Sequence, residues 1–190
     1  KFIFAIGNKH IFNPAAFAVS LTALTINQSA SWWIGTAVML PFVIVSGLLM
    51  VKKLRRFDVV LSFFVIALVT IIAPKISQNN IVNFASKTLT NTPMLFFAFI
   101  MLTEPLTMPP TKKLRMVYGV LVGFLFAPWV HIGSVYSTPE LALLVGNVFS
   151  YLVSPKQKLL LRFQKQNIVA EDTIDFIFQP DRPLTYSPGQ

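Results

Sequence analysis

Long apolar stretches separated by short polar segments fill the chain as far as Pro155, where the pattern changes. Apolar runs of this kind are typical of helices that cross or re-enter a membrane, so residues 1–154 are predicted to form an all-α polytopic membrane domain. We expect about six transmembrane or re-entrant helices, at Ile11–Ile26, Trp33–Val51, Val59–Ala73, Pro93–Leu102, Met116–Ile132 and Leu141–Val153.

Two of these segments are predicted to be short or broken helices. Trp33–Val51 would extend about 28 Å as a helix, close to the ~30 Å of a bilayer core. Ile11–Ile26 and Pro93–Leu102 are shorter, and each has a proline-bearing polar break, at Asn13 in the first and at Thr103–Thr111 after the second. Irregular backbone at membrane depth must be covered by protein or line a cavity. We therefore expect two short or broken helices whose inner ends meet near the middle of the fold.

Residues 155–190 follow a different pattern. Positions 174–178 read Ile-Asp-Phe-Ile-Phe, a period-two alternation that predicts a β-strand. Leu159–Ile168 is predicted as the preceding strand, and the proline-rich Pro180–Gly189 as a loop. Because two strands cannot form an independent barrel, we expect this region to be the first part of a truncated antiparallel β-barrel.

The placement of basic residues predicts the topology. Lysine and arginine gather at Lys52–Arg56, at Lys112–Arg115 and at Lys156–Arg162, whereas the alternate loops hold only Lys75 and Lys87. Cytoplasmic loops carry the excess of basic residues. We therefore expect six crossings with both ends in the cytoplasm, in a multi-pass protein of the bacterial inner membrane.

Composition excludes several other classes of protein. Hydrophobic residues make up 54% of the chain and charged residues only 12%. The net charge is +9, and the basic residues that produce it lie in runs between apolar segments. This distribution indicates the lipid bilayer rather than nucleic acid as the partner. With no cysteine, the chain can form no disulfide, thiolate zinc site or cysteine-ligated iron–sulfur cluster. No metal site is expected, and the start at Lys1 without a signal peptide predicts an internal fragment.

Polar residues within the apolar segments are the candidate site. Polar groups at membrane depth are costly, so they are usually functional or are satisfied inside the bundle. The candidates to line a flavin or substrate cavity are Asn13, Pro14, Thr103, Glu104, Thr107 and Asn147. Structural alternatives remain open: a helix cap for Asn13, an interfacial position for Glu104, and an interhelical hydrogen bond for Asn147. No catalytic residue can be named.

The same polar features carry a family resemblance. Lys9–Ala16, Ser29–Trp32, Phe97–Gly119 and Pro139–Asn147 follow one another in the order found in two related membrane proteins, the D-type component of the Rnf electron-transport complex and the B-type component of the sodium-translocating NADH:quinone reductase. The chain resembles this family over roughly residues 8–153. Members have ten transmembrane helices in two related halves and hold flavin within the membrane, so the resemblance implies a membrane-bound FMN or riboflavin.

One departure from the family concerns how the flavin is attached. Members usually bind FMN covalently through a threonine in an S/T-G-A-T motif that follows the tryptophan. Here Trp33 leads directly into the second apolar segment and no such motif is present. We therefore expect the flavin to be bound non-covalently.

The end of the chain resembles a second family. Asp172–Phe178 and Pro183–Gln190 are similar to the first strands of ferredoxin–NADP reductase-type FAD domains, over roughly residues 157–190. The resemblance implies FAD in this domain, with NAD(P)H or ferredoxin as a partner bound by sequence beyond it. The alternative is any β-hairpin followed by a Pro-Gly-Gln turn.

Together these observations predict part of an NAD(P)H-dependent oxidoreductase whose catalytic FAD domain lies mostly outside this chain. Electrons would pass from a cytoplasmic NAD(P)H- or ferredoxin-linked FAD module to a membrane flavin, and then to quinone or another acceptor in the membrane or on its far side. Two alternatives remain open, namely a transporter or channel-like helical bundle and a simple membrane anchor for the reductase.

Overall fold

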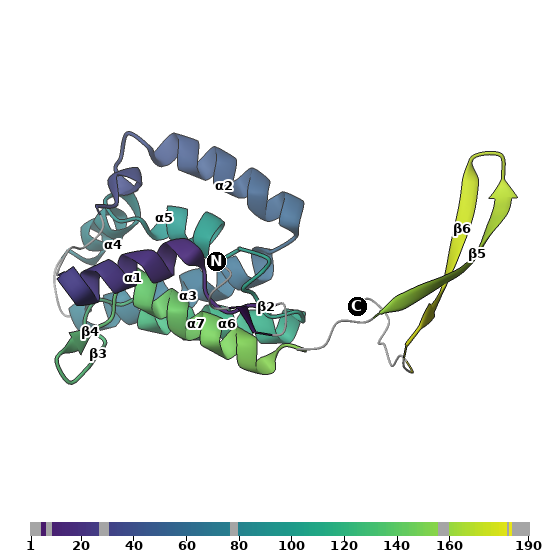
Figure 1. The fold of residues 1–190 in the computed structure, drawn as a ribbon. Helices are drawn as coiled ribbons and strands as arrows, with labels where there is room; N and C mark the ends of the chain where they lie inside the picture. The colour runs from purple at the N-terminus through teal and green to yellow at the C-terminus, as the bar shows by residue number, and fades with distance from the viewer. Residues whose placement is uncertain are drawn as a thin grey trace. The chain divides into compact units, whose positions relative to one another are not determined.

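The computed structural model describes residues 5–6, 9–26, 31–76, 80–155, 160–181 and 183. The chain forms two compact units, Lys1–Ser154 and Pro155–Gln190 (Figure 1). This division falls where the sequence changes from long apolar segments to period-two alternation.

The first unit is helical. Its helices are α1 (Pro14–Ile26), α2 (Leu40–Leu54), α3 (Phe57–Ile72), α4 (Ile81–Thr90), α5 (Met94–Phe96), α6 (Lys112–Leu125) and α7 (Pro139–Val153). Short 3-10 turns lie at Trp33–Gly35 and Ala73–Lys75, and a π-helical stretch at Phe97–Met101 follows α5. Two small hairpins pair β1 (Ala5–Ile6) with β2 (Lys9–His10) and β3 (His131–Ile132) with β4 (Val135–Tyr136).

Helices α3 and α6 form the centre of this unit. A Cβ atom added to Gly119 would lie 2.6 Å from the carbonyl oxygen of Val59, and one added to Gly123 would lie 2.7 Å from that of Phe63. The two glycines therefore allow the helix backbones to touch, as small residues do between membrane helices. The ring of Phe63 then packs against Phe97 and Phe126 at the core of the unit.

The helix boundaries correct two of the predicted segments. Trp33–Val51 is not one helix: α2 begins only at Leu40, where Pro41 suits a first turn. The prediction of a helix over Met116–Ile132 is wrong at its C-terminal end, because α6 ends at Leu125 and the chain continues into the β3–β4 hairpin. Helix α4 was not predicted, and its amphipathic sequence explains why an apolar pattern did not mark it.

Membrane-crossing capacity differs among the helices. Within the described part of the chain, α3 with its 3-10 extension, Phe57–Lys75, is the one helix long and apolar enough to cross a membrane, with a mean hydropathy of 2.4. Helices α1 and α7 are apolar but shorter. The predicted six crossings therefore stay a prediction.

The second unit is an antiparallel hairpin of β5 (Leu161–Ala170) and β6 (Thr173–Pro180). Phe163 lies opposite Phe178, and its ring also contacts Phe176. All three aromatic side chains are about half exposed. The predicted strands are thus present, whereas most of the predicted loop Pro180–Gly189 lies outside the described residues.

Candidate functional site

Asn13 connects three parts of the helical unit. It caps α1, because its Oδ1 accepts hydrogen bonds from the backbone N–H groups of Ala15 and Ala16 at 3.0 and 3.1 Å. Its Nδ2 donates to Glu104 Oε2 at 2.8 Å, and its backbone N–H donates to Asn147 Oδ1 at 2.8 Å. The helix-cap interpretation is therefore confirmed, and the same residue also contacts two distant segments, Glu104 through its side chain and Asn147 through its backbone N–H.

Glu104 lies in the turn that follows the π-helical stretch and is half-buried. Its Oε2 accepts the bond from Asn13 and a second one from Thr107 Oγ1 at 3.2 Å. Thr107 is buried beside it. The hydroxyl of Thr103 is buried too, but it donates at 2.6 Å to the carbonyl of Phe99 and so closes the end of its own helix.

Asn147 links α7 to both α1 and α6. Besides accepting from Asn13, it donates through Nδ2 to the hydroxyl of Tyr118 at 3.3 Å, and both side chains are fully buried. The interhelical hydrogen bond that was the structural alternative for Asn147 is therefore present. Tyr118 was not among the predicted site residues; a phenol hydroxyl within an apolar helix is the sequence signal that could have singled it out.

The polar cluster made of Asn13, Glu104, Thr107, Tyr118 and Asn147 lies at the middle of the helical unit. Tyr118 is halfway along α6, and α1 packs along α7 (Figure 1). The start of the short helix α1 and the turn after the irregular helix of α5 and the π-helical stretch thus meet here, as predicted. Pro14 takes the first position of α1 and is exposed, so its role is to start the helix.

A cavity of about 560 Å³ adjoins Asn13 and Glu104. Its other walls include the aromatic side chains of Trp32, Trp33 and Phe96. The rings of Trp32 and Phe96 are 6.0 Å apart between centroids and tilted by 52°. The cavity therefore combines aromatic surfaces with a carboxamide and a carboxylate at one place.

Trp32 is held in position by a buried acidic residue. Its indole Nε1 donates at 2.8 Å to Oε1 of Glu140, at the start of α7. Trp32 and Glu140 also line a neighbouring cavity of about 430 Å³. Because the hydrogen bond fixes the indole, the wall between the two cavities is preorganised. Sequence reasoning did not select Glu140.

The chemistry of this site is that of a binding cavity. Among the described residues, no group of three His, Asp or Glu side chains could hold a metal ion. Ligand sites are typically concave and mostly apolar, with a few polar groups that fix orientation, and enclose about 300–1,000 Å³. The cavity beside Asn13 and Glu104 has this character.

Irregular helices and helix ends that meet at a buried polar cluster are features of helical membrane proteins. The chain belongs to the NQR2, RnfD, RnfE family, because the sequence model of that family matches residues 7–158. It is therefore a membrane subunit of an electron-transport complex. The resemblance over residues 8–153 is thereby confirmed, and the polar cluster lies within the matched range. The comparisons with curated proteins and with solved structures gave no match.

Proposed function

We propose that this subunit carries out flavin-dependent electron transfer across the membrane. Electrons would enter from a cytoplasmic FAD module that is reduced by NAD(P)H or ferredoxin. They would reach a flavin held by residues 1–154 and leave to quinone or an acceptor on the far side. Family membership supports the setting, and the aromatic-walled cavity beside Asn13 and Glu104 is the observation that carries the proposal.

The residues of the cavity fit an isoalloxazine ring. That ring is planar and aromatic and has amide-like N–H and C=O groups along one edge, so Trp32, Trp33 and Phe96 would hold its faces while Asn13 and Glu104 meet the polar edge. In the described part of the chain, the hydrogen bonds of Glu104 are made by Oε2, which leaves Oε1 for a ligand. A bound flavin supplies one- and two-electron chemistry that amino-acid side chains lack.

The hairpin of β5 and β6 supports the proposed FAD module. Phe163, Phe176 and Phe178 leave apolar rings exposed on β5 and β6, and an isolated two-stranded hairpin is marginally stable at best. We propose that the hairpin forms the first two strands of a larger reductase-type β-barrel that binds FAD. The FAD-binding residues themselves would lie beyond Gln190.

A transporter-like bundle is the second candidate. In this unit the capped N-terminus of the short helix α1 contacts a carboxylate on an irregular segment, and transporters also build substrate and ion sites at the ends of interrupted helices. The visible absorbance of the purified full-length protein separates the two. Flavin bands that are bleached by NAD(P)H support electron transfer, whereas colourless folded protein supports a transporter or a simple anchor.

We expect the membrane flavin to be released by denaturation. The chain lacks the S/T-G-A-T motif through which the resembling proteins attach FMN covalently. Acid precipitation of the full-length protein should leave all flavin in the supernatant, where its fluorescence is measured. A fluorescent protein band after denaturing electrophoresis would contradict this expectation.

We expect Ser86 and Gln164 to face opposite sides of the membrane. Both side chains are exposed, on α4 and β5 respectively, and the positive-inside rule places α4 outside and the hairpin in the cytoplasm. Because the chain has no cysteine, Ser86→Cys and Gln164→Cys each give a single thiol. A membrane-impermeant maleimide added to intact cells should label only the first. Labelling of both from outside would show the topology to be wrong.

A further inference from the structure

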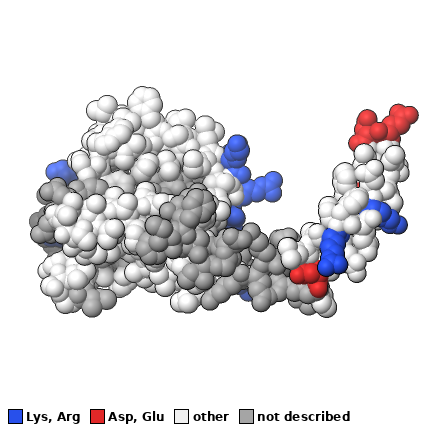
Figure 2. Space-filling model, viewed as in Figure 1, with Lys and Arg blue, Asp and Glu red and all other residues white. Residues whose placement is uncertain are grey.

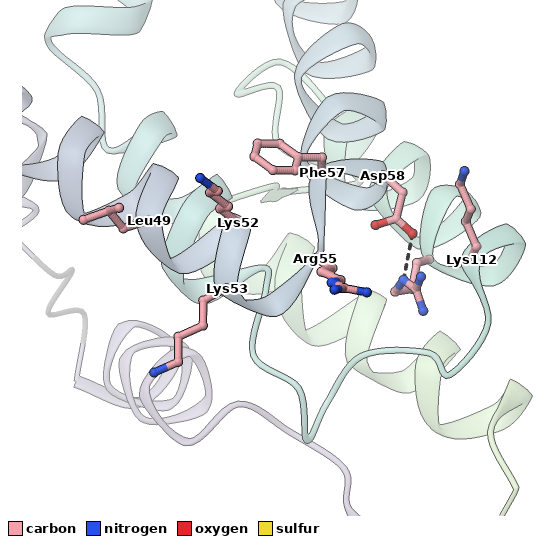
Figure 3. A pocket seen from close by; sticks show the side chains of 8 residues that line it. Leu49, Lys52, Lys53, Arg55, Phe57, Asp58 and Lys112 are labelled. Carbon is pink, nitrogen blue, oxygen red and sulfur yellow. Dashed lines mark hydrogen bonds and ion pairs between the residues drawn. The ribbon is translucent and has the colours of Figure 1, made fainter. Parts of the chain in front are cut away.

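A basic pocket lies where three helices end. The C-terminal end of α2 and the first turns of α3 and α6 enclose about 1050 Å³. Figure 2 shows Lys and Arg side chains gathered over the end of α2. Figure 3 shows the lining side chains, and the charged ones are Lys52, Lys53, Arg55, Asp58, Lys112 and Arg115. Five cations and one carboxylate therefore line this pocket.

The one carboxylate is already paired. Asp58 Oδ2 accepts from Arg115 Nε at 2.8 Å, and both side chains are largely buried. In the described part of the chain, this is the only salt bridge. The other four cations of the pocket therefore have no acidic partner there, namely Lys52, Lys53, Arg55 and Lys112. Like charges held around one hollow repel each other and favour an anion between them.

The residue behind the pocket shows the same excess of positive charge. Arg56 is the residue before α3, and its Nε is buried without a hydrogen-bond partner among the described residues. Burial, and then repulsion from Arg115, lower the pKa of its guanidinium, and Asp58 offsets them only in part.

The turn between α2 and α3 places an arginine where glycine is usual. Arg55 ends α2 with φ 53° and ψ 52°, the left-handed conformation, and its backbone N–H donates to the carbonyl of Lys52. Among the described residues it is the one non-glycine residue with positive φ. Glycine adopts this position at helix ends without steric cost. A charged residue held there points to a use for its side chain.

The pocket has an apolar side as well as cations. Leu49 and Phe57 line the same pocket with mostly or partly exposed side chains. Leu49 continues a stripe on α2 with Val45 and Phe42, which are also exposed and lie on one helical face. A soluble phosphate compound would use only the cations, whereas a phospholipid would use both parts.

We propose that this pocket binds the phosphate headgroup of an anionic phospholipid, whose acyl chains lie along the apolar stripe of α2. Basic pockets between helices at a membrane surface are suited to such headgroups. The proposal rests on the chain being a membrane subunit and not on the flavin site. Flavin content therefore serves as an independent readout, expected to be unchanged in the variants below.

The test compares two variants that lose the same charge. Lys52→Gln with Lys112→Gln removes two cations of the pocket, and Lys75→Gln with Lys87→Gln removes two beyond the other end of α3. Binding of phosphatidylglycerol to the full-length protein in neutral detergent is measured by native mass spectrometry, with phosphatidylcholine and glycerol 3-phosphate as comparison ligands. We expect the pocket variant to bind phosphatidylglycerol about thirtyfold more weakly, and the control to match the parent protein.

Three results would overturn the proposal. An equal loss of phosphatidylglycerol binding in both double variants would show that binding depends only on the net charge of the protein. If phosphatidylcholine binds as tightly as phosphatidylglycerol, the pocket does not recognise the charge of the headgroup. If glycerol 3-phosphate binds as tightly, the ligand is a soluble anion instead. If the double variant does not fold, Arg55→Gly is used, because glycine suits the left-handed turn. It should bind phosphatidylglycerol several-fold more weakly, and unchanged binding would count against the proposal.

Discussion

Replacing Glu104 by glutamine is expected to slow the reduction of the acceptor by NAD(P)H about tenfold, equal to ~1.4 kcal/mol of barrier. Glutamine keeps the size of the side chain and an oxygen that accepts from Asn13 and Thr107. The substitution therefore removes the negative charge beside the cavity and little else. Expression and thermal stability should stay close to those of the parent protein.

The control for this prediction is Glu171→Gln, which makes the same chemical change at an exposed position between β5 and β6. Steady-state turnover and the thermal midpoint are measured for both variants. A solvated, uninvolved glutamate would shift stability by less than about 0.5 kcal/mol and leave turnover alone. If Glu104→Gln turns over like the control, Glu104 serves only as a hydrogen-bond acceptor.

Replacing Asn147 by alanine is expected to destabilise the helical unit by about 2–4 kcal/mol and to empty the flavin cavity. The change leaves the backbone N–H of Asn13 and the hydroxyl of Tyr118 without their partner in a fully buried place, and each such group costs about 1–3 kcal/mol. Loss of the bond to Asn13 also frees the start of α1, and with it the position of Glu104.

Two further variants make this second prediction specific. Tyr118→Phe removes only one of the two hydrogen bonds, so it should cost about 1 kcal/mol and retain the flavin. Asn83→Ala, at an exposed position of α4, should change neither property. Thermal unfolding in detergent and flavin content per protein are the measurements. A melting curve for Asn147→Ala that coincides with that of Asn83→Ala would show that the cluster does not hold the fold together.

Local sequence predicted the short first helix and the irregular backbone after Leu102 well. A proline fixes backbone geometry and removes a hydrogen-bond donor wherever it occurs, so the start of α1 after Asn13 and the turn after Leu102 are visible without any structure. The same local reasoning failed at Trp33–Val51 and Met116–Ile132. Turns at membrane surfaces can be as apolar as helices, and hydropathy alone does not separate the two.

The sequence by itself determined the division near Pro155, the apolar helical class of the first unit and the polar residues that interrupt it. Only the tertiary structure decided which of those residues meet. Asn13 lies 91 residues from Glu104 and 134 from Asn147 along the chain, and no local pattern encodes contacts at such separations. The partners are set by helix packing, which glycines such as Gly123 permit and which also brings Trp32 to Glu140. For the same reason the aromatic cavity and the basic pocket became visible only when the ends of different helices were placed together.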